Sequence, residues 1–319
     1  MKLISILGAV AAALVAACVE QPATGPAGPR AALSMQPVGP AGSTVFYSAR
    51  DGGGTLHVYA MNPDGSDPVG LTSGPWKDQW PDVSPNGRDV VFSSNRDGGT
   101  HIFRVSTSGG DPEDLTSLAG ALDDWPRWSP DGHEIAFHSK RDGAANYHVY
   151  VLDLRDGSTT QVTNCACGLD DMWPEWSPDG RKLSFRRGTN SAGHVYVLDL
   201  GDGSETDLTP GAAALNQMAA WSQNGNTIAF MSNRDGYPAV YVMNADGSDV
   251  VNLTPKDAAD PASAWMSRAP SWTRDGRILF MSKRPSTGGD IELFSMDAGG
   301  GNLVRLTTSA GEDGGPRAR

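Results

Sequence analysis

The sequence predicts an all-β fold, a six-bladed β-propeller made of four-stranded antiparallel blades. A segment best seen at residues 128–143 (WSPDGHEIAFHSKRDG) returns in related form from Val83, Trp176, Trp221 and Trp272. Self-similarity of this kind indicates stacked units, because a unit that cannot bury its own apolar face must pack on its neighbours. The 39 glycines and 22 prolines of the 319-residue chain also fit many short strands joined by tight turns.

Each unit has the pattern of one blade. In the third unit we expect strands over 125–129, 134–139, 147–153 and 159–163. Turn sequences rich in Asp and Gly separate these runs, since glycine supplies a positive φ and aspartate can bond its own backbone. Four runs and three turns make one antiparallel meander, which is the unit of a propeller blade.

Two markers count the units. A second-strand phenylalanine recurs at Phe46, Phe92, Phe137, Phe185, Phe230 and Phe280. A blade-ending pair recurs at Leu71-Thr72, Leu115-Thr116, Val162-Thr163, Leu208-Thr209, Leu253-Thr254 and Leu306-Thr307. Both markers give six blades.

The first unit lacks a clear inner strand of its own. Residues 312–319 (EDGGPRAR) resemble the start of an inner strand, with Pro316 in the place of Pro126. Residues 33–39 (LSMQPVG) are the alternative. We expect the C-terminal strand to complete the first blade and close the ring.

The first 42 residues have a different composition from the repeats. Lys2 and the apolar run 3–17 read as a signal peptide over residues 1–17, since the run is too short to span a bilayer. The run ends LVAAC, which resembles a bacterial lipobox with Cys18 as the lipidated residue, although an ordinary secretory signal remains the alternative. Residues 18–42, rich in Pro, Ala and Gly, then form a tether, and residues 43–319 form the propeller.

Charge limits the class of partner. The chain has 37 acidic and 25 basic side chains and a formal net charge of -12. Phosphate binding needs a basic face, so nucleic acid is excluded as a partner, whereas cationic ligands and basic proteins fit.

The repeat resembles the TolB-type (PD40, WD40-like) propeller of bacterial envelopes. The matching pieces are W-S-P-D-G, the I-A-F run before R-D-G, V-Y-V-M-N and the closing L-T, over about residues 43–316. The resemblance implies a periplasmic binding or scaffold role without a cofactor, as a monomer, with an envelope protein such as the peptidoglycan-associated lipoprotein, or an envelope polymer, as partner. The TolB pattern includes an α/β domain before the propeller, whereas only the short tether stands there in this sequence. Val19 after Cys18 favours the outer membrane, with the protein facing the periplasm.

Two enzyme classes also contain propellers of this kind. Propellers of this kind also precede the catalytic domain of prolyl oligopeptidases, but those need a G-x-S-x-G elbow, which this sequence does not contain. Propeller lyases that act on acidic sugars use histidines around a metal ion. We therefore keep a metal-dependent enzyme acting on saccharides as the alternative to a non-catalytic binding protein.

The candidate site is a recurring Asp-x-Trp-Pro segment at the start of three inner strands. Its residues are Asp78 and Trp80, Asp123 and Trp125, and Asp171 and Trp173, with Asp124 adding charge. Inner strands line the channel, so these residues should meet at one mouth and offer carboxylates and indoles to a partner. The alternative is that each aspartate caps its own turn and each tryptophan covers a blade edge.

Histidines recur at the start of the third strand, at His57, His101, His148 and His194. Ligands must converge at about 2 Å from one ion, and equal positions in neighbouring blades are too far apart for that. We expect no metal site. Cys165 and Cys167 are expected to be free thiols, because a bridge across one residue is strained, and a labile bridge in an oxidising envelope is the alternative. The Arg-Asp-Gly segments are interpreted as turns.

Overall fold

The structure is a computed structural model that describes residues 44–318 apart from 119, 142, 212, 257–265, 285–288 and 309–310. The predicted signal peptide, Cys18 and the whole tether lie outside the described residues. Those that are described form strands and turns, and no helix among them is long and apolar enough to cross a membrane.

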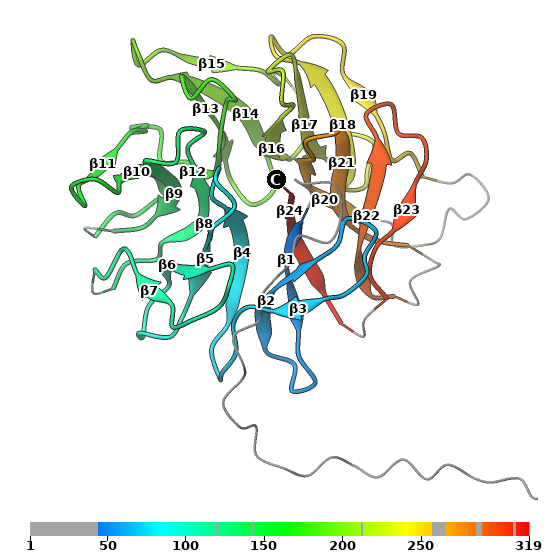
Figure 1. The fold of residues 1–319 in the computed structure, drawn as a ribbon. Helices are drawn as coiled ribbons and strands as arrows, with labels where there is room; N and C mark the ends of the chain where they lie inside the picture. The colour runs from blue at the N-terminus through cyan, green and yellow to red at the C-terminus, as the bar shows by residue number, and fades with distance from the viewer. Residues whose placement is uncertain are drawn as a thin grey trace, which may run out of the picture. The chain divides into compact units, whose positions relative to one another are not determined.

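Six four-stranded antiparallel sheets surround a central channel (Figure 1), which confirms the predicted fold class. Blade 1 contains β24 (Asp313–Ala318), β1 (Val45–Arg50), β2 (Leu56–Met61) and β3 (Val69–Gly70). Blade 2 contains β4 (Asp78–Val83), β5 (Asp89–Ser94), β6 (His101–Ser106) and β7 (Glu113–Asp114). Blade 3 contains β8 (Asp124–Trp128), β9 (Glu134–Ser139), β10 (His148–Asp153) and β11 (Thr159–Gln161).

The remaining blades repeat this order from the channel outward. Blade 4 contains β12 (Asp170–Trp176), β13 (Lys182–Gly188), β14 (Gly193–Asp199) and β15 (Glu205–Asp207). Blade 5 contains β16 (Asn216–Trp221), β17 (Thr227–Ser232), β18 (Ala239–Asn244) and β19 (Val251–Asn252). Blade 6 contains β20 (Met266–Trp272), β21 (Arg277–Lys283), β22 (Ile291–Asp297) and β23 (Val304–Arg305).

The C-terminal strand closes the ring, as predicted. β24 pairs antiparallel with β1, and the register runs from Val45 opposite Ala318 to Ala49 opposite Asp313. All six residues of β24 are buried. Figure 1 shows this last strand, in red, beside the first strand, in blue. The two ends of the propeller thus hold each other in one sheet.

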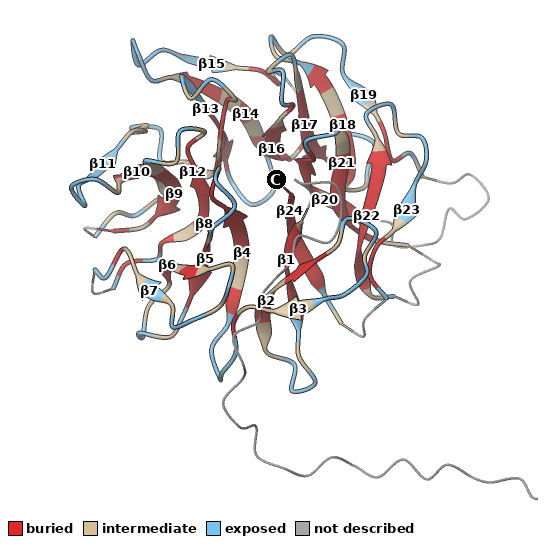
Figure 2. Cartoon of the chain, viewed as in Figure 1, coloured by how far each residue is buried: buried red, intermediate tan, exposed pale blue. Residues whose placement is uncertain are grey.

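The three inner strands of each blade are largely buried, and the outermost strand is the most exposed (Figure 2). The second and third strands of each blade pack between neighbouring sheets, and an aromatic pair across these two strands recurs in every blade. The pairs are Tyr47–Tyr59, Phe92–Phe103, Phe137–Tyr150, Phe185–Tyr196, Phe230–Tyr241 and Phe280–Phe294. The predicted marker Phe46 is therefore wrong by one residue, because Tyr47 occupies this position in blade 1. Arg50 of the Arg-Asp-Gly segment follows Tyr47 by three residues, whereas Arg96 follows Phe92 by four, and this difference hid the shift.

The turn and closing residues that recur between blades have local structural roles. In blade 3, Ser129 Oγ donates to Asp131 Oδ1 at 2.6 Å and accepts from the Glu134 N–H at 2.9 Å, while Gly132 takes a φ of 77°. Such an Asx-type turn explains the Ser-Pro-Asp-Gly segment. The closing threonine acts similarly, since Thr163 Oγ1 accepts the Val149 N–H at 2.9 Å.

Candidate functional site

The three aspartates of the Asp-x-Trp-Pro segments are buried ion-pair partners. Asp78, Asp123 and Asp171 have no exposed surface. Arg96 Nη2 lies 2.8 Å from Asp78 Oδ1, and Arg141 Nη2 lies 2.6 Å from Asp123 Oδ2. The expected acidic patch is therefore not formed by these carboxylates, because an arginine of the same blade covers and neutralises each one.

Blade 4 makes the same ion pair from a different sequence. Arg187 donates from Nε to Asp171 Oδ1 at 2.7 Å and from Nη2 to Asp171 Oδ2 at 3.0 Å. It stands two residues after Phe185, whereas Arg141 stands four residues after Phe137. The arginine of Arg-Asp-Gly thus belongs to this pairing as well as to the turn, which the sequence analysis missed. The signal available was that an Asp-x-Trp-Pro and an arginine occur together in the same blades.

The tryptophans take an unusual backbone conformation. Trp80, Trp125 and Trp173 have φ values of 56°, 59° and 57°. Each lies where the pairing of the inner strand shifts register, as at the bulge between Gln79 and Asp82. The equivalent residues of the other blades, Met218, Ala269 and Gly315, also have positive φ. Bulges redirect side chains, and a left-handed residue other than glycine persists only where its surroundings fix it.

The bulges bring the three indoles together. The ring centroids of Trp80 and Trp125 are 4.2 Å apart, and those of Trp125 and Trp173 are 6.2 Å apart. Trp125 is buried, while Trp80 and Trp173 are half-buried. The three indoles therefore lie against one another at the bulges of the inner strands; that these residues bind a partner at the mouth stays a prediction.

Each bulge is tied to the preceding blade by the N–H of its tryptophan. Ser48 Oγ accepts from Trp80 and Ser93 Oγ accepts from Trp125, both at 3.1 Å. His138 Nδ1 accepts from Trp173 at 3.4 Å, so a histidine replaces serine in the third link. Burial, together with the Arg186 and Arg127 guanidinium groups, lowers the pKa of His138 to about 3. His138 is neutral at neutral pH, as this acceptor role requires.

Asp124 differs from the other predicted aspartates because it is half-buried at the mouth. Its Oδ1 accepts the N–H of Trp125 at 2.8 Å, and burial raises the pKa of its carboxyl group. It is the one aspartate of the predicted set that retains partial access to solvent.

Below the indoles, charged side chains cross the channel. Glu175 Oε2 accepts from Arg127 Nε at 3.0 Å and from Arg317 Nη2 at 2.7 Å. Arg127 is 1% exposed, and burial with the nearby Arg317 lowers its pKa below the usual arginine value. The three residues come from blades 3, 4 and 1, so this network links distant parts of the ring inside the channel.

Three of the four recurring histidines, His57, His101 and His194, pair with carboxylates. His101 Nδ1 lies 2.9 Å from Asp114 Oδ2, and His194 Nδ1 lies 2.9 Å from Asp207 Oδ2. Among the described residues, the group that could hold a metal ion is Asp97, His101 and Asp114, whose ligand atoms lie within 4.8 Å of one another. This group belongs to blade 2 alone, at the start of its third strand.

Cys165 and Cys167 form a disulfide, so the expectation of free thiols is wrong. Both residues lie in the loop between β11 and β12, outside the strands. A loop can adapt its backbone to the short bridge in a way that a strand cannot.

A family model described as the TolB beta propeller domain matches residues 32–165 and 125–269, which together make up more than half of the chain. The chain belongs to the TolB β-propeller family. No curated protein sequence matches it.

Solved structures similar to this family member share its fold. TolB from Acinetobacter baumannii is 22% identical, with a TM-score of 0.73 over 86% of this chain and 66% of that chain. A putative TolB from Agrobacterium tumefaciens is 24% identical, with a TM-score of 0.67 over 84% of this chain and 90% of that chain. An oligogalacturonate lyase in complex with manganese is 15% identical, with a TM-score of 0.55 over 83% of this chain and 74% of that chain. The chain thus spans just under two thirds of the Acinetobacter protein.

Proposed function

We propose that this protein is a non-catalytic binding lipoprotein of the bacterial envelope, which uses the tryptophan-lined mouth of its propeller to hold a protein or an envelope polymer. The observation that carries the proposal is the cluster of Trp80, Trp125 and Trp173, held on strained bulges at one end of the channel. Backbone strain and bulges are concentrated at functional sites in proteins.

Exposed apolar side chains add contact area on the same end of the ring. Trp76, Leu118 and Leu122 are 37%, 39% and 41% exposed, and they lie in the loops that lead into β4 and β8. Exposed large apolar residues gathered on one face mark interaction surfaces more often than scattered ones do. Trp80, Trp173 and Asp124 are the predicted site residues that can touch a partner, whereas Asp78, Asp123 and Asp171 hold the bulges in place from beneath.

The membrane anchor is part of the same proposal. Lipid on Cys18 and the tether over residues 18–42 would keep the propeller at the outer membrane, facing the periplasm. Metabolic labelling with a clickable palmitate analogue tests this: we expect label on the wild-type protein and none on the Cys18→Ala variant. Equal labelling of both, or of neither, contradicts the anchor without touching the binding face.

Site-specific photo-crosslinking tests the binding face. A photoreactive phenylalanine replaces Leu122 at the tryptophan-lined end, and in a control it replaces Val251, which is 51% exposed on the outer strand β19. We expect one partner to be captured in intact cells from position 122 and not from position 251, with the yield reduced by Trp80→Ala and Trp173→Ala. Capture of the peptidoglycan-associated lipoprotein would indicate a Tol-like assembly. Equal capture from both positions would remove this face from the proposal.

The alternative function is a metal-dependent enzyme acting on saccharides. The group Asp97, His101 and Asp114 is the observation that favours it, because carboxylate and imidazole ligands suit Mn²⁺ and Zn²⁺. Equilibrium dialysis against manganese, followed by an assay on oligogalacturonate, tests this reading. Binding lost in His101→Ala, together with turnover of the oligosaccharide, would favour the enzyme over the scaffold.

A further inference from the structure

The propeller carries a cavity at the opposite end from the tryptophan-lined mouth. It lies between blades 4 and 5, has a volume of about 760 Å³, and is bordered by the turns that follow β12 and β16. The equivalent groove between blades 3 and 4 has a volume of about 410 Å³. Exact repetition of the blades would give two grooves of equal volume, so the side chains at one of the two grooves must be arranged differently.

The difference traces to the tryptophan that ends each inner strand. Trp128, Trp176 and Trp272 are 4%, 5% and 8% exposed, whereas Trp221 is half-buried and lines the larger cavity. Trp176 Nε1 donates to the Arg127 carbonyl at 3.1 Å, and Trp272 Nε1 donates to the Ala220 carbonyl at 3.1 Å. Both acceptors belong to the inner strand of the preceding blade.

Trp221 donates instead to a side chain on the second strand of the preceding blade. Its Nε1 lies 3.0 Å from Ser184 Oγ, and that hydroxyl lies 3.4 Å from the Glu175 carbonyl, which is the equivalent backbone acceptor. The strand register places Phe46, Val91, Ala136, Ala229 and Leu279 at the positions equivalent to Ser184. Ser184 is thus the one hydroxyl in this set of six, and it holds the indole of Trp221 one strand farther from the channel.

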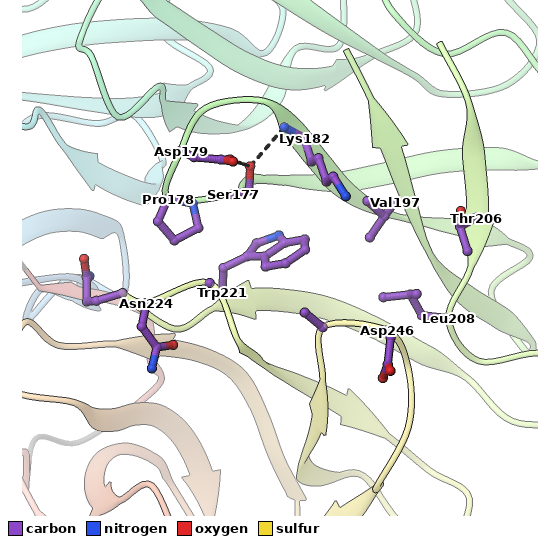
Figure 3. Close-up of a pocket in the computed structure, with 13 residues that line it drawn as sticks. Ser177, Pro178, Asp179, Lys182, Val197, Thr206, Leu208, Trp221, Asn224 and Asp246 are labelled. Atoms are coloured by element: carbon purple, nitrogen blue, oxygen red, sulfur yellow. Dashed lines mark hydrogen bonds between the residues drawn. The ribbon is translucent and has the colours of Figure 1, made fainter. Parts of the chain in front are cut away.

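The cavity combines an aromatic face with a polar rim. Figure 3 shows the Trp221 indole among the lining residues, with Lys182 and Asp179 on one side and Asp246 on the other. Asn224 and Thr206 add an amide and a hydroxyl. The two carboxylates and one ammonium group give these charged residues a net charge of -1.

We propose that this groove binds a neutral pyranose-based glycan. The apolar C–H face of a pyranose ring matches the indole face, whose π electrons give it a negative potential. Sugar hydroxyl groups both donate and accept hydrogen bonds, which matches a rim of carboxylates, amides and ammonium. The net negative charge of the rim disfavours acidic sugars. This site is separate from the tryptophan-lined mouth and does not depend on the function proposed for it.

Titration calorimetry and indole N–H NMR with fully N-acetylated chitotetraose, which is neutral, and with tetragalacturonate as an acidic comparison, test the proposal on the full chain. We expect chitotetraose to bind, to shift the Trp221 indole resonance, and to bind at least about tenfold more tightly than tetragalacturonate. Trp221→Ala should abolish binding. Ser184→Ala should weaken it about tenfold or more, because the indole then loses its acceptor on β13 and the groove narrows.

A matched pair of turn variants controls for folding. Asn224 Oδ1 accepts from Ser222 Oγ and the Asn226 N–H, and Asn86 Oδ1 accepts from Ser84 Oγ and the Arg88 N–H. Asn224→Ala and Asn86→Ala therefore remove the same two hydrogen bonds from equivalent turns and should lower the free energy of unfolding by similar amounts. Only Asn224→Ala should weaken chitotetraose binding. No binding by the folded wild-type protein, binding that survives Ser184→Ala and Trp221→Ala, or preference for a proline-rich peptide or for tetragalacturonate would overturn the proposal.

Discussion

Arg141 and Asp123 form an ion pair beneath the surface of the third blade, with 2.6 Å between Arg141 Nη2 and Asp123 Oδ2. The carboxylate has no exposed surface, and the arginine side chain is 8% exposed. A pair removed from water in this way stabilises the fold only while both partners are present, because a single buried charge is costly. The pair fixes the end of the inner strand next to the bulge that carries Trp125.

Loss of this carboxylate should destabilise the protein severely. We expect Asp123→Ala to lower the free energy of unfolding by about 3–5 kcal/mol, because Arg141 is left buried without a partner. Asp123→Asn should cost clearly less, since blade 5 places Asn216 opposite Arg234 at 3.1 Å. Urea denaturation of both variants measures the difference. The exposed substitution Asp111→Asn, as a control, should change stability by less than about 0.5 kcal/mol. An Asn variant as unstable as the Ala variant would contradict the pairing role.

The fold could be predicted because the residues that define a blade recur along the chain. The aromatic pairs and the closing threonines recur in every blade and the turn serines in most of them, and the segment 312–319, with Pro316 in the place of Pro126, predicts β24. The register of β1 could not be predicted in this way, because one residue fewer separates the aromatic position from Arg-Asp-Gly in blade 1, which places Phe46 where Tyr47 belongs. A short deletion changes which face a strand residue occupies without changing its composition.

The site could be predicted in position but not in chemistry. Spacing located Asp171 and Trp173 at the start of an inner strand, yet it gave no indication that Arg187 folds back onto the carboxylate. Long side chains reach across several positions, so Arg141 and Arg187 arrive at the same place from different registers. Likewise, the groove at Trp221 depends on the single hydroxyl of Ser184 in a neighbouring blade, which no linear pattern brings beside it.

Gly315 should tolerate no side chain. It takes the bulge position of blade 1 with a φ of 59°, and a Cβ there would lie 2.8 Å from Trp80 Cε3. We expect Gly315→Ala to lower the free energy of unfolding by about 1–2 kcal/mol because alanine disfavours the left-handed conformation. The clash with Trp80 should lower it further. In a double-mutant cycle, combining it with Trp80→Ala should recover the part due to the clash. Strictly additive costs would show that the indole does not occupy this space.

His138 should make the stability of the protein depend on pH. Burial and nearby arginines lower its pKa from 6.5 to about 3, so the folded state stays neutral while the unfolded state takes up a proton below pH 6.5. The free energy of unfolding should thus be unaffected by this group above pH 6.5 and fall as the pH drops from 6.5 towards 3, by up to about 1.4 kcal/mol per pH unit.

The variant His138→Ser isolates this contribution. Serine preserves an acceptor for Trp173, as Ser93 does for Trp125. Denaturation is measured at pH 7.5 and at pH 5.0. Between these two pH values, the free energy of unfolding should fall by about 2 kcal/mol more for the wild-type protein than for the variant. Equal losses in the two proteins would place the titration elsewhere.

Removal of β24 should open the ring. Residues 313–318 are buried, they supply the inner strand of blade 1, and Arg317 reaches Glu175 of blade 4 inside the channel. Without them, β1 becomes an unpaired edge strand facing the channel, and an exposed edge strand promotes association with other chains. We therefore expect a chain truncated after Glu312 to lose its cooperative thermal transition and to aggregate in gel filtration.

A milder variant distinguishes the effect of ring closure by β24 from the effect of the Arg317–Glu175 ion pair in the channel. Arg317→Met keeps the strand and its length but removes one of the two cations on Glu175, so it should keep the ring closed and lose only part of the stability. Adding a synthetic peptide of residues 312–319 to the truncated chain should restore a cooperative transition, because the strand pairs through its backbone. A truncated chain that melts like the wild-type protein would show that β24 is dispensable and that closure rests on the contacts between the remaining blades.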